Sequence, residues 1–113
     1  MKAESRGLWL RVYIHESLRH GHHALYEAMV ALARREGLAN ATVYRAMEGF
    51  GMHRHLHTSR LVDVSDDLTM IVEFVDTEPA IRRFVGLLDA MVPHGTATLS
   101  PVQIVTYRAE PPA

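Results

Sequence analysis

The residues best suited to chemistry in this chain are histidines, of which there are eight, and no cysteine accompanies them. Three of them, His53, His55 and His57, alternate, so their side chains would share one side of an extended segment. Imidazole binds zinc, copper or nickel well, which makes this spacing a candidate metal site. Their Cβ atoms would lie about 6.5–7 Å apart on a strand, so one ion would require the segment to bend. The alternative is a solvated polar loop.

A second group, His20, His22 and His23, follows His15 and Glu16. A carboxylate beside several imidazoles suits a general base or a metal site. The alternative is a polar connecting loop. The sequence contains no Ser-His-Asp order and no phosphate-binding P-loop. We therefore expect no enzymatic activity.

Gly49-Phe50-Gly51 stands just before the first histidine group. Two glycines allow positive φ or a close approach of the backbone to a ligand, and the phenyl ring between them can anchor the turn. The alternative is that the glycines only bend a strand into a loop.

Arg45 and Arg108 are the cations best placed to bind an anionic ligand. Both fall in predicted strands, where a rigid backbone aims the guanidinium and bidentate phosphate contacts are favoured. The alternative for each is an ion pair, within or between subunits, with Glu48 or Glu73.

Composition sets the broad class. The chain has 113 residues, 48% hydrophobic and 22% charged, with a net charge of −1. These values predict one globular domain over residues 1–113 and give no electrostatic reason for a nucleic-acid partner. The start is polar and no apolar run approaches the roughly 18 residues that span a bilayer. With no cysteine, a cytoplasmic location is expected.

The apolar periodicity that must position these residues predicts the order β-α-β-β-α-β. Right-handed crossovers then favour an α+β, ferredoxin-like fold: a four-stranded antiparallel sheet with both helices on one face. The predicted strands are 8–15, 41–48, 69–75 and 99–107, and a return strand could begin at 60–63 before the third of them. The predicted helices are 24–36, which Gly37 ends, and 77–92, which Asp76 or Thr77 caps and which Pro93 and Gly95 end. Residues 16–23 are predicted to form a loop and the tail, 109–113, to be frayed.

Two helices cover only one face of such a sheet, yet apolar and aromatic residues occur at both parities of the strands. Trp9 and Tyr13 alternate with Leu10 and Val12. An uncovered face of that content would be an unusually large exposed patch, so we expect a homo-oligomer.

The order and spacing of several short motifs resemble the PII-like group catalogued as domain of unknown function 190, relatives of the PII signalling proteins. The similarity extends over roughly residues 8–108. The residues that carry it are Leu25-Tyr26-Glu27-Ala28, Gly37-Leu38-Ala39-Asn40-Ala41-Thr42-Val43-Tyr44-Arg45, Gly49-Phe50-Gly51 and Glu73-Phe74-Val75-Asp76-Thr77, with the closing strand.

The resemblance implies a ferredoxin-like homotrimer that binds adenine nucleotides in the clefts between subunits. It implies a T-loop, here about residues 50–60, that engages a target protein. Gly49–Gly51 match the start of that loop, where PII backbone amides approach the nucleotide. Arg108 matches an arginine that faces the phosphates.

This chain departs from the PII pattern at three places. His53 stands near the position of a PII glutamine, and Thr106 replaces a second arginine. The loop before the last strand is short and has no lysine; Gly95 is its only glycine and the candidate ligand residue of this loop. These departures argue against a triphosphate site and leave a smaller or less charged nucleotide, or none.

Three functions follow as hypotheses. The first is a PII-like regulator that binds a small anionic metabolite, with an adenine nucleotide as candidate, and presents a mobile loop to an unknown target protein. Membrane transporters are the target class common among PII relatives. The second is a metal-binding trimer that uses His53, His55 and His57, as in the similarly folded copper-tolerance proteins. The third is an oligomeric scaffold that binds nothing.

Overall fold

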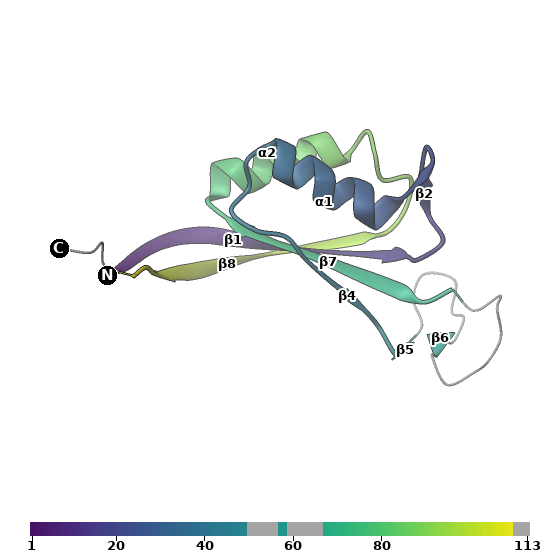
Figure 1. Cartoon of the computed structure of the whole chain (residues 1–113), viewed down its shortest axis with the longest axis horizontal. Coiled ribbons are helices and arrows are strands. Elements are labelled where there is room, and N and C mark those ends of the chain that lie inside the picture. The colour runs from purple at the N-terminus through teal and green to yellow at the C-terminus, as the bar shows by residue number, and fades with distance from the viewer. Residues whose placement is uncertain (50–56, 59–66, 110–113) are drawn as a thin grey trace.

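The computed structural model describes residues 1–49, 57–58 and 67–109. Its centre is an antiparallel sheet of four strands in the order β4-β7-β1-β8 (Figure 1). This is the predicted α+β, ferredoxin-like arrangement. The main strands are β1 (Lys2–His15), β4 (Thr42–Arg45), β7 (Thr69–Asp76) and β8 (Thr96–Tyr107), and the helices are α1 (Leu25–Arg35) and α2 (Glu78–Leu88).

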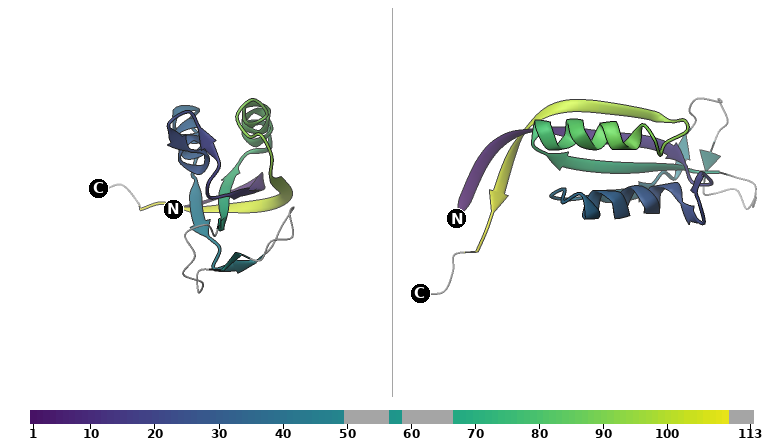
Figure 2. Two further views of the ribbon diagram at one scale, coloured as in Figure 1. Left: turned by 90° about the vertical axis from the view of Figure 1, so that its right-hand side faces the viewer. Right: turned by 90° about the horizontal axis from the view of Figure 1, so that it is seen from above.

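Strand β1 separates the two faces of the sheet by the alternation that the sequence predicts. Leu8, Leu10, Val12 and Ile14 are each 5% exposed or less, whereas the intervening side chains are half-buried. Both helices lie on the side of the buried set (Figure 2). The core there includes Phe74 and Phe84, whose ring centroids are 4.7 Å apart. One face of the sheet is therefore packed and no described helix covers the other.

Helix α1 ends as the sequence predicts, at Gly37. This glycine has φ +76°, in the left-handed region that other residues avoid. Gly37 N donates to Arg34 O at 3.2 Å and Leu38 N donates to Ala33 O at 3.0 Å. These two bonds form a Schellman motif, which satisfies carbonyls that the helix end would leave without donors.

Helix α2 is shorter than predicted. Thr77 caps its start by accepting a hydrogen bond from Ala80 N at 3.4 Å, and the helix ends at Leu88 rather than at Val92. Met91 N and Val92 N both donate to Leu88 O at 2.9 Å, which closes a turn in place of another helical turn. Met91 and Val92 still pack against the core.

Two connections also differ from expectation. The segment predicted as a loop contains a small hairpin, β2 (Arg19–His20) and β3 (His23–Ala24), which turns at Gly21 with φ +61°. The strand expected over 41–48 ends at Arg45, and a separate pair follows, β5 (Glu48–Gly49) with β6 (His57–Thr58). The return strand expected at 60–63 and the end of the tail lie outside the described residues.

Strand β1 begins six residues earlier than predicted. It pairs with the whole of β8, from Lys2 with Tyr107 to Tyr13 with Thr96. The ribbon formed by Lys2–Arg6 and Gln103–Tyr107, called the arm below, extends beyond the helices (Figure 1). Its residues in β1 lack apolar alternation, which is why the sequence did not indicate a strand there.

Gly7 stands where the arm leaves the body of the sheet. A Cβ at this position would lie 2.3 Å from Asp76 O and 2.5 Å from Ile104 Cδ1, closer than any side chain tolerates. Only glycine allows β1 to pass the end of β7 here.

We predict that Gly7→Ala lowers the free energy of unfolding by about 1–3 kcal/mol, because backbone and core must shift to admit the methyl group. Urea unfolding at a fixed protein concentration measures this change. Gly86→Ala is the matched control: no atom would lie within 4 Å of a Cβ at that position, and alanine favours a helix. It should be neutral or stabilising, and equal losses in the two variants would contradict the role given to Gly7.

Candidate functional site

Two of the predicted ligand residues, Arg45 and Gly95, lie at the same end of the sheet. Arg45 closes β4 and pairs with Met70, which in turn pairs with Ile14. Gly95 precedes Thr96, the partner of Tyr13 on the other side of β1. Arg45 and Gly95 therefore stand on one row across the sheet, about 14 Å apart at three strand spacings.

The backbone geometry explains why position 95 requires glycine. Its φ is +153°, and a Cβ there would lie 2.8 Å from Tyr13 O and 2.9 Å from Ile14 Cγ2. The close approach that glycine permits at this position is therefore to β1.

Arg108 lies at the opposite end of the molecule, just past the arm. Its N donates to Met1 O, and the Met1 amino group donates to Arg108 O, both at 2.8 Å. The twelve residues of β8 between the two ends correspond to about 40 Å of strand. Within one subunit, Arg108 is therefore too far from Arg45 and Gly95 to share a ligand with them.

The other predicted residues are only partly described. Gly49 lies in β5 opposite His57, whose backbone forms part of β6. Phe50, Gly51, His53 and His55 lie outside the described residues, so the metal hypothesis built on the alternating histidines stays a prediction. Within residues 1–49, 57–58 and 67–109, no group of three or more His, Cys, Asp or Glu side chains is arranged to hold a metal ion.

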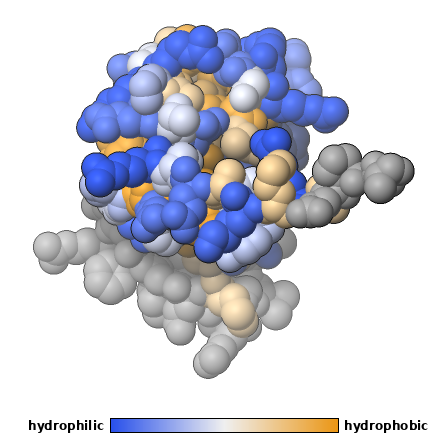
Figure 3. Space-filling model, turned by 90° about the vertical axis from the view of Figure 1, so that its left-hand side faces the viewer, coloured by the Kyte–Doolittle hydropathy of each residue, from blue (hydrophilic) through white to orange (hydrophobic). Residues whose placement is uncertain are grey.

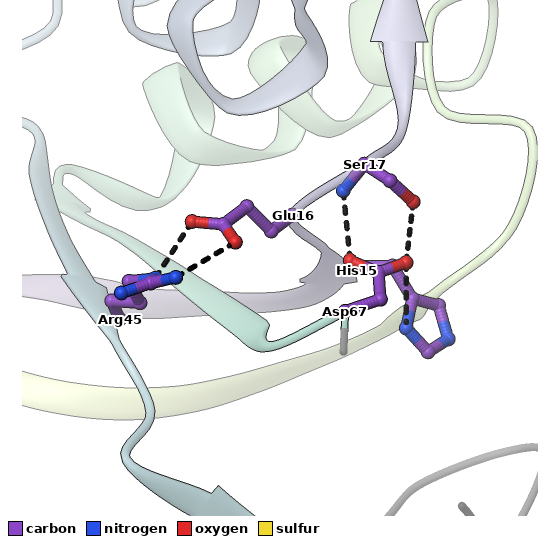
Figure 4. Close-up of polar contacts among 5 residues, drawn as sticks. All are labelled: His15, Glu16, Ser17, Arg45 and Asp67. Carbon is purple, nitrogen blue, oxygen red and sulfur yellow. Dashed lines mark hydrogen bonds and ion pairs between the residues drawn. The ribbon is translucent and has the colours of Figure 1, made fainter. Parts of the chain in front are cut away.

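Arg45 is engaged by a carboxylate that sequence reasoning did not pair with it. Its Nε lies 2.7 Å from Glu16 Oε2, and its Nη2 donates to Glu16 Oε1 at 3.1 Å (Figure 4). The hydrogen bond to Glu16 raises the pKa of Arg45 above its ordinary value. Of the partners expected for this arginine, Glu73 is excluded, because its position in the register places it on the other face of the sheet.

On that other face Glu73 contacts a different residue, Tyr44. It accepts a hydrogen bond from the Tyr44 hydroxyl, which raises the pKa of Tyr44 above its ordinary value. Tyr44 is 42% exposed.

A second carboxylate, Asp67, contacts the residues on either side of Glu16. Ser17 N donates to Asp67 Oδ1 at 2.9 Å, and the Ser17 hydroxyl donates to Asp67 Oδ2 (Figure 4). His15 Nδ1 lies 3.6 Å from the same oxygen. The three residues His15–Ser17, called the β1 corner below, thus contact both Arg45 and Asp67.

Backbone bonds join the same places. Glu16 N donates to Leu68 O and Ala46 N donates to Thr69 O, both at 2.8 Å. Arg45 and Asp67 flank the chain segment that contains the proposed T-loop. The β1 corner therefore fixes both ends of that segment.

Ser17 and Asp67 are the site residues that sequence reasoning missed, and for Glu16 it missed the partner. Glu16 pairs with Arg45, 29 residues away, and the partner of Ser17 is 50 residues away. No local motif signals such contacts.

The face of the sheet without helices has apolar and aromatic residues on both sides of a charged pair of positions, Arg11 and Glu73. Trp9 and Tyr13 of β1 lie beside Val75 and Ile71 of β7, and all four are half-buried. The Arg11 guanidinium carbon lies 4.0 Å from the centroid of the Trp9 ring. In the described part of the chain the buried Arg11 Nε has no hydrogen-bond acceptor. This surface is neither well solvated nor fully packed.

The arm also has exposed apolar side chains. Seen from the end that carries both termini, hydrophobic surface reaches solvent between polar side chains (Figure 3). Val105 is 39% exposed and Tyr107 is 76% exposed. A hollow of about 850 Å³ lies beside the arm, and its charged residues have both signs: Glu4, Arg6, Glu78 and Arg82. It contains none of the predicted ligand residues.

Within the described residues no helix is long and apolar enough to cross a membrane.

Comparison with solved structures gives PII-like proteins. The chain is similar to CPII, a nitrogen regulatory PII-like protein of Thiomonas intermedia K12, in its structure bound to ADP, AMP and bicarbonate. The TM-score is 0.59 and the identity 17%, and the comparison covers 90% of this chain and 91% of that one. It is also similar to a PII-like signalling protein of Thermus thermophilus, with a TM-score of 0.58, 19% identity and 91% of each chain covered.

Sequence comparison gives the family. A UPF0166 protein of Aquifex aeolicus is 28% identical over 96 residues, which cover 85% of this chain and 90% of that protein. A UPF0166 protein of Methanocaldococcus jannaschii is 31% identical over 74 residues, 66% of this chain and 68% of that protein. The family model DUF190, described as "Uncharacterized ACR, COG1993", matches residues 7–104. The chain therefore belongs to the DUF190 family and has the fold of the PII-like proteins.

Proposed function

We propose that this protein is a PII-like regulator, without enzymatic activity, that binds an adenine nucleotide in clefts between the subunits of a homotrimer. The observation that carries the proposal is the separation of the candidate ligand residues. Arg45 and Gly95 stand at one end of the sheet and Arg108 at the other, about 40 Å of strand away. One nucleotide can contact both sets only if two copies contribute them.

The uncovered sheet face supports the assembly. Its half-buried aromatic and aliphatic side chains would form an unusually large exposed patch on a monomer. A two-stranded ribbon with no cover, such as the arm, is at best marginally stable alone. Contact with neighbouring copies would bury both surfaces, and trimers of this kind are what the resemblance to PII proteins implies.

The ligand class rests on the departures from the PII pattern and on the neighbouring structures. CPII binds ADP and AMP, and bicarbonate accompanies them. In this chain Thr106 replaces an arginine and the segment before β8 contains no lysine. Fewer cations neutralise less phosphate charge, so a mono- or diphosphate suits the site better than a triphosphate.

The β1 corner supports a switch. It holds both ends of the segment between Arg45 and Asp67, so a ligand that contacts Arg45 acts at one of these attachments. Occupancy of the cleft would then change the order of the proposed T-loop and its hold on a target protein. A membrane transporter remains the target class to test first.

The first prediction concerns assembly. In size-exclusion chromatography with light scattering, the protein should have a mass three times that of the 12.7 kDa chain. Ile71→Asp places a charge on the uncovered sheet face and should reduce the mass to that of a monomer or of an unstable species. Leu87→Asp, on the exposed surface of α2, is the matched control and should leave the mass unchanged. A monomeric wild type at micromolar concentration would contradict the proposal.

The second prediction concerns the ligand. ADP and AMP should raise the thermal midpoint, since a ligand specific for the folded state adds about 2.7 kcal/mol at a hundredfold excess over its Kd. ATP should have a smaller effect. Arg108→Ala should abolish the shift, whereas Arg35→Ala, which removes an exposed cation at the end of α1, should retain it. No response to any nucleotide, or equal loss in both variants, would refute a site built on Arg108.

A further inference from the structure

The contact between Arg45 and Glu16 has the form of an occupied anion site. Two nitrogens on one edge of the guanidinium, Nε and Nη2, face the two oxygens of the Glu16 carboxylate at 2.7 and 3.1 Å (Figure 4). This is the edge and the bidentate geometry with which arginine binds phosphate. A phosphate that binds this edge of Arg45 and the present position of the Glu16 carboxylate therefore exclude each other.

We propose that Glu16 is a specificity-determining residue that occupies the Arg45 anion site until a nucleotide phosphate displaces it. The inference rests on the proposed function in placing Arg45 at the ligand. It adds that binding is an exchange, in which the guanidinium gives up an internal carboxylate for an external phosphate.

The exposure of the pair allows that exchange. The Glu16 side chain is 30% exposed and that of Arg45 is 53% exposed, so solvent and ligand reach both. Exposed ion pairs contribute little to stability, and breaking this one costs correspondingly little. The backbone of Glu16 stays in place after its side chain leaves Arg45, because Glu16 N donates to Leu68 O independently of the side chain.

The exchange sets a threshold on ligand charge. A carboxylate-like monoanion would replace one equivalent ion pair by another and gain nothing from Arg45. A terminal phosphate carries about −1.5 to −2 charges at pH 7 and offers more acceptor oxygens. Glu16 would therefore favour phosphorylated ligands over singly charged ones at this position.

The exchange also has a structural consequence. Glu16 links the β1 corner to the end of β4, whereas Ser17 links the same corner to Asp67. Displacing Glu16 breaks the first link and leaves the second. The ligand would thus remove one side-chain contact at the end of β4, while the backbone bond from Ala46 N to Thr69 O stays in place.

The test is a double-mutant cycle of nucleotide affinity by calorimetry, with ADP, AMP and adenosine as the probes. It uses the wild type, Glu16→Gln, Arg45→Gln and the double variant. Glu36→Gln is the matched control, because Glu36 also pairs with an arginine, Arg83, and the side-chain exposures of that pair are similar, 31% and 64%.

We expect Glu16→Gln to tighten ADP and AMP by about 1.5- to fivefold, the factor that corresponds to an exposed ion pair. Adenosine, which lacks a phosphate, should show no gain, and Glu36→Gln should match the wild type. In the Arg45→Gln background the gain should vanish. If Glu16→Gln binds ADP measurably while the ADP affinity of the wild type is too weak to measure, the result would support the same conclusion.

Other outcomes overturn the inference. An equal gain in the Arg45→Gln background, for adenosine or in Glu36→Gln would show a general charge effect. No gain from Glu16→Gln, while Arg45→Gln weakens ADP, would remove Glu16 from the site and leave the proposed function standing. Unchanged ADP affinity in Arg45→Gln would exclude Arg45 itself. If neither the wild type nor Glu16→Gln binds nucleotide, both proposals fail.

Discussion

The pairing of β1 with two neighbours at once is the constraint on which the rest of this structure depends. Its residues Leu8–His15 pair with β7 on one side, and its residues Lys2–Tyr13 pair with β8 on the other. Because side chains alternate along a strand, this one segment assigns every neighbouring residue to the packed face or to the uncovered face. A slip of one residue would move Leu8, Leu10, Val12 and Ile14 out of the core.

The same pairing sets the distance between the candidate ligand residues. The register places Arg45 and Gly95 near one end of β1, and Arg108 beyond the other. Under the proposed function, each copy would then carry one half-site at each of its two ends. The uncovered face between them, with Trp9 and Tyr13 at its centre, is the surface through which copies would meet. Assembly and ligand binding would then depend on the same strand.

The β1 corner gives the site its connection to the neighbouring segment. A carboxylate from the corner reaches Arg45, and a serine from the corner reaches Asp67. Both contacts are exposed and therefore individually weak. Weak contacts at the ends of a segment suit regulation, because a ligand can alter them without unfolding the sheet.

The sequence by itself determined the fold class, because period-2 and period-3.6 apolar patterns and turn residues act locally. The buried parity of β1, the end of α1 at Gly37 and the cap at Thr77 all follow from nearest neighbours in the chain. The same local signals failed where burial was absent. The residues Lys2–Arg6 became a strand because β8 supplies their hydrogen-bond partners, and α2 ended at Leu88, four residues before its predicted end.

The tertiary structure alone decided which polar residues meet. Arg45 was identified from its strand position, but the structure pairs it with Glu16, which is 29 residues away, and places Glu73 on the opposite face. Asp67 and Ser17 had no signal, because contacts over 50 residues leave no periodicity. Side-chain type sets what chemistry a residue can perform, and strand register sets which residues perform it together.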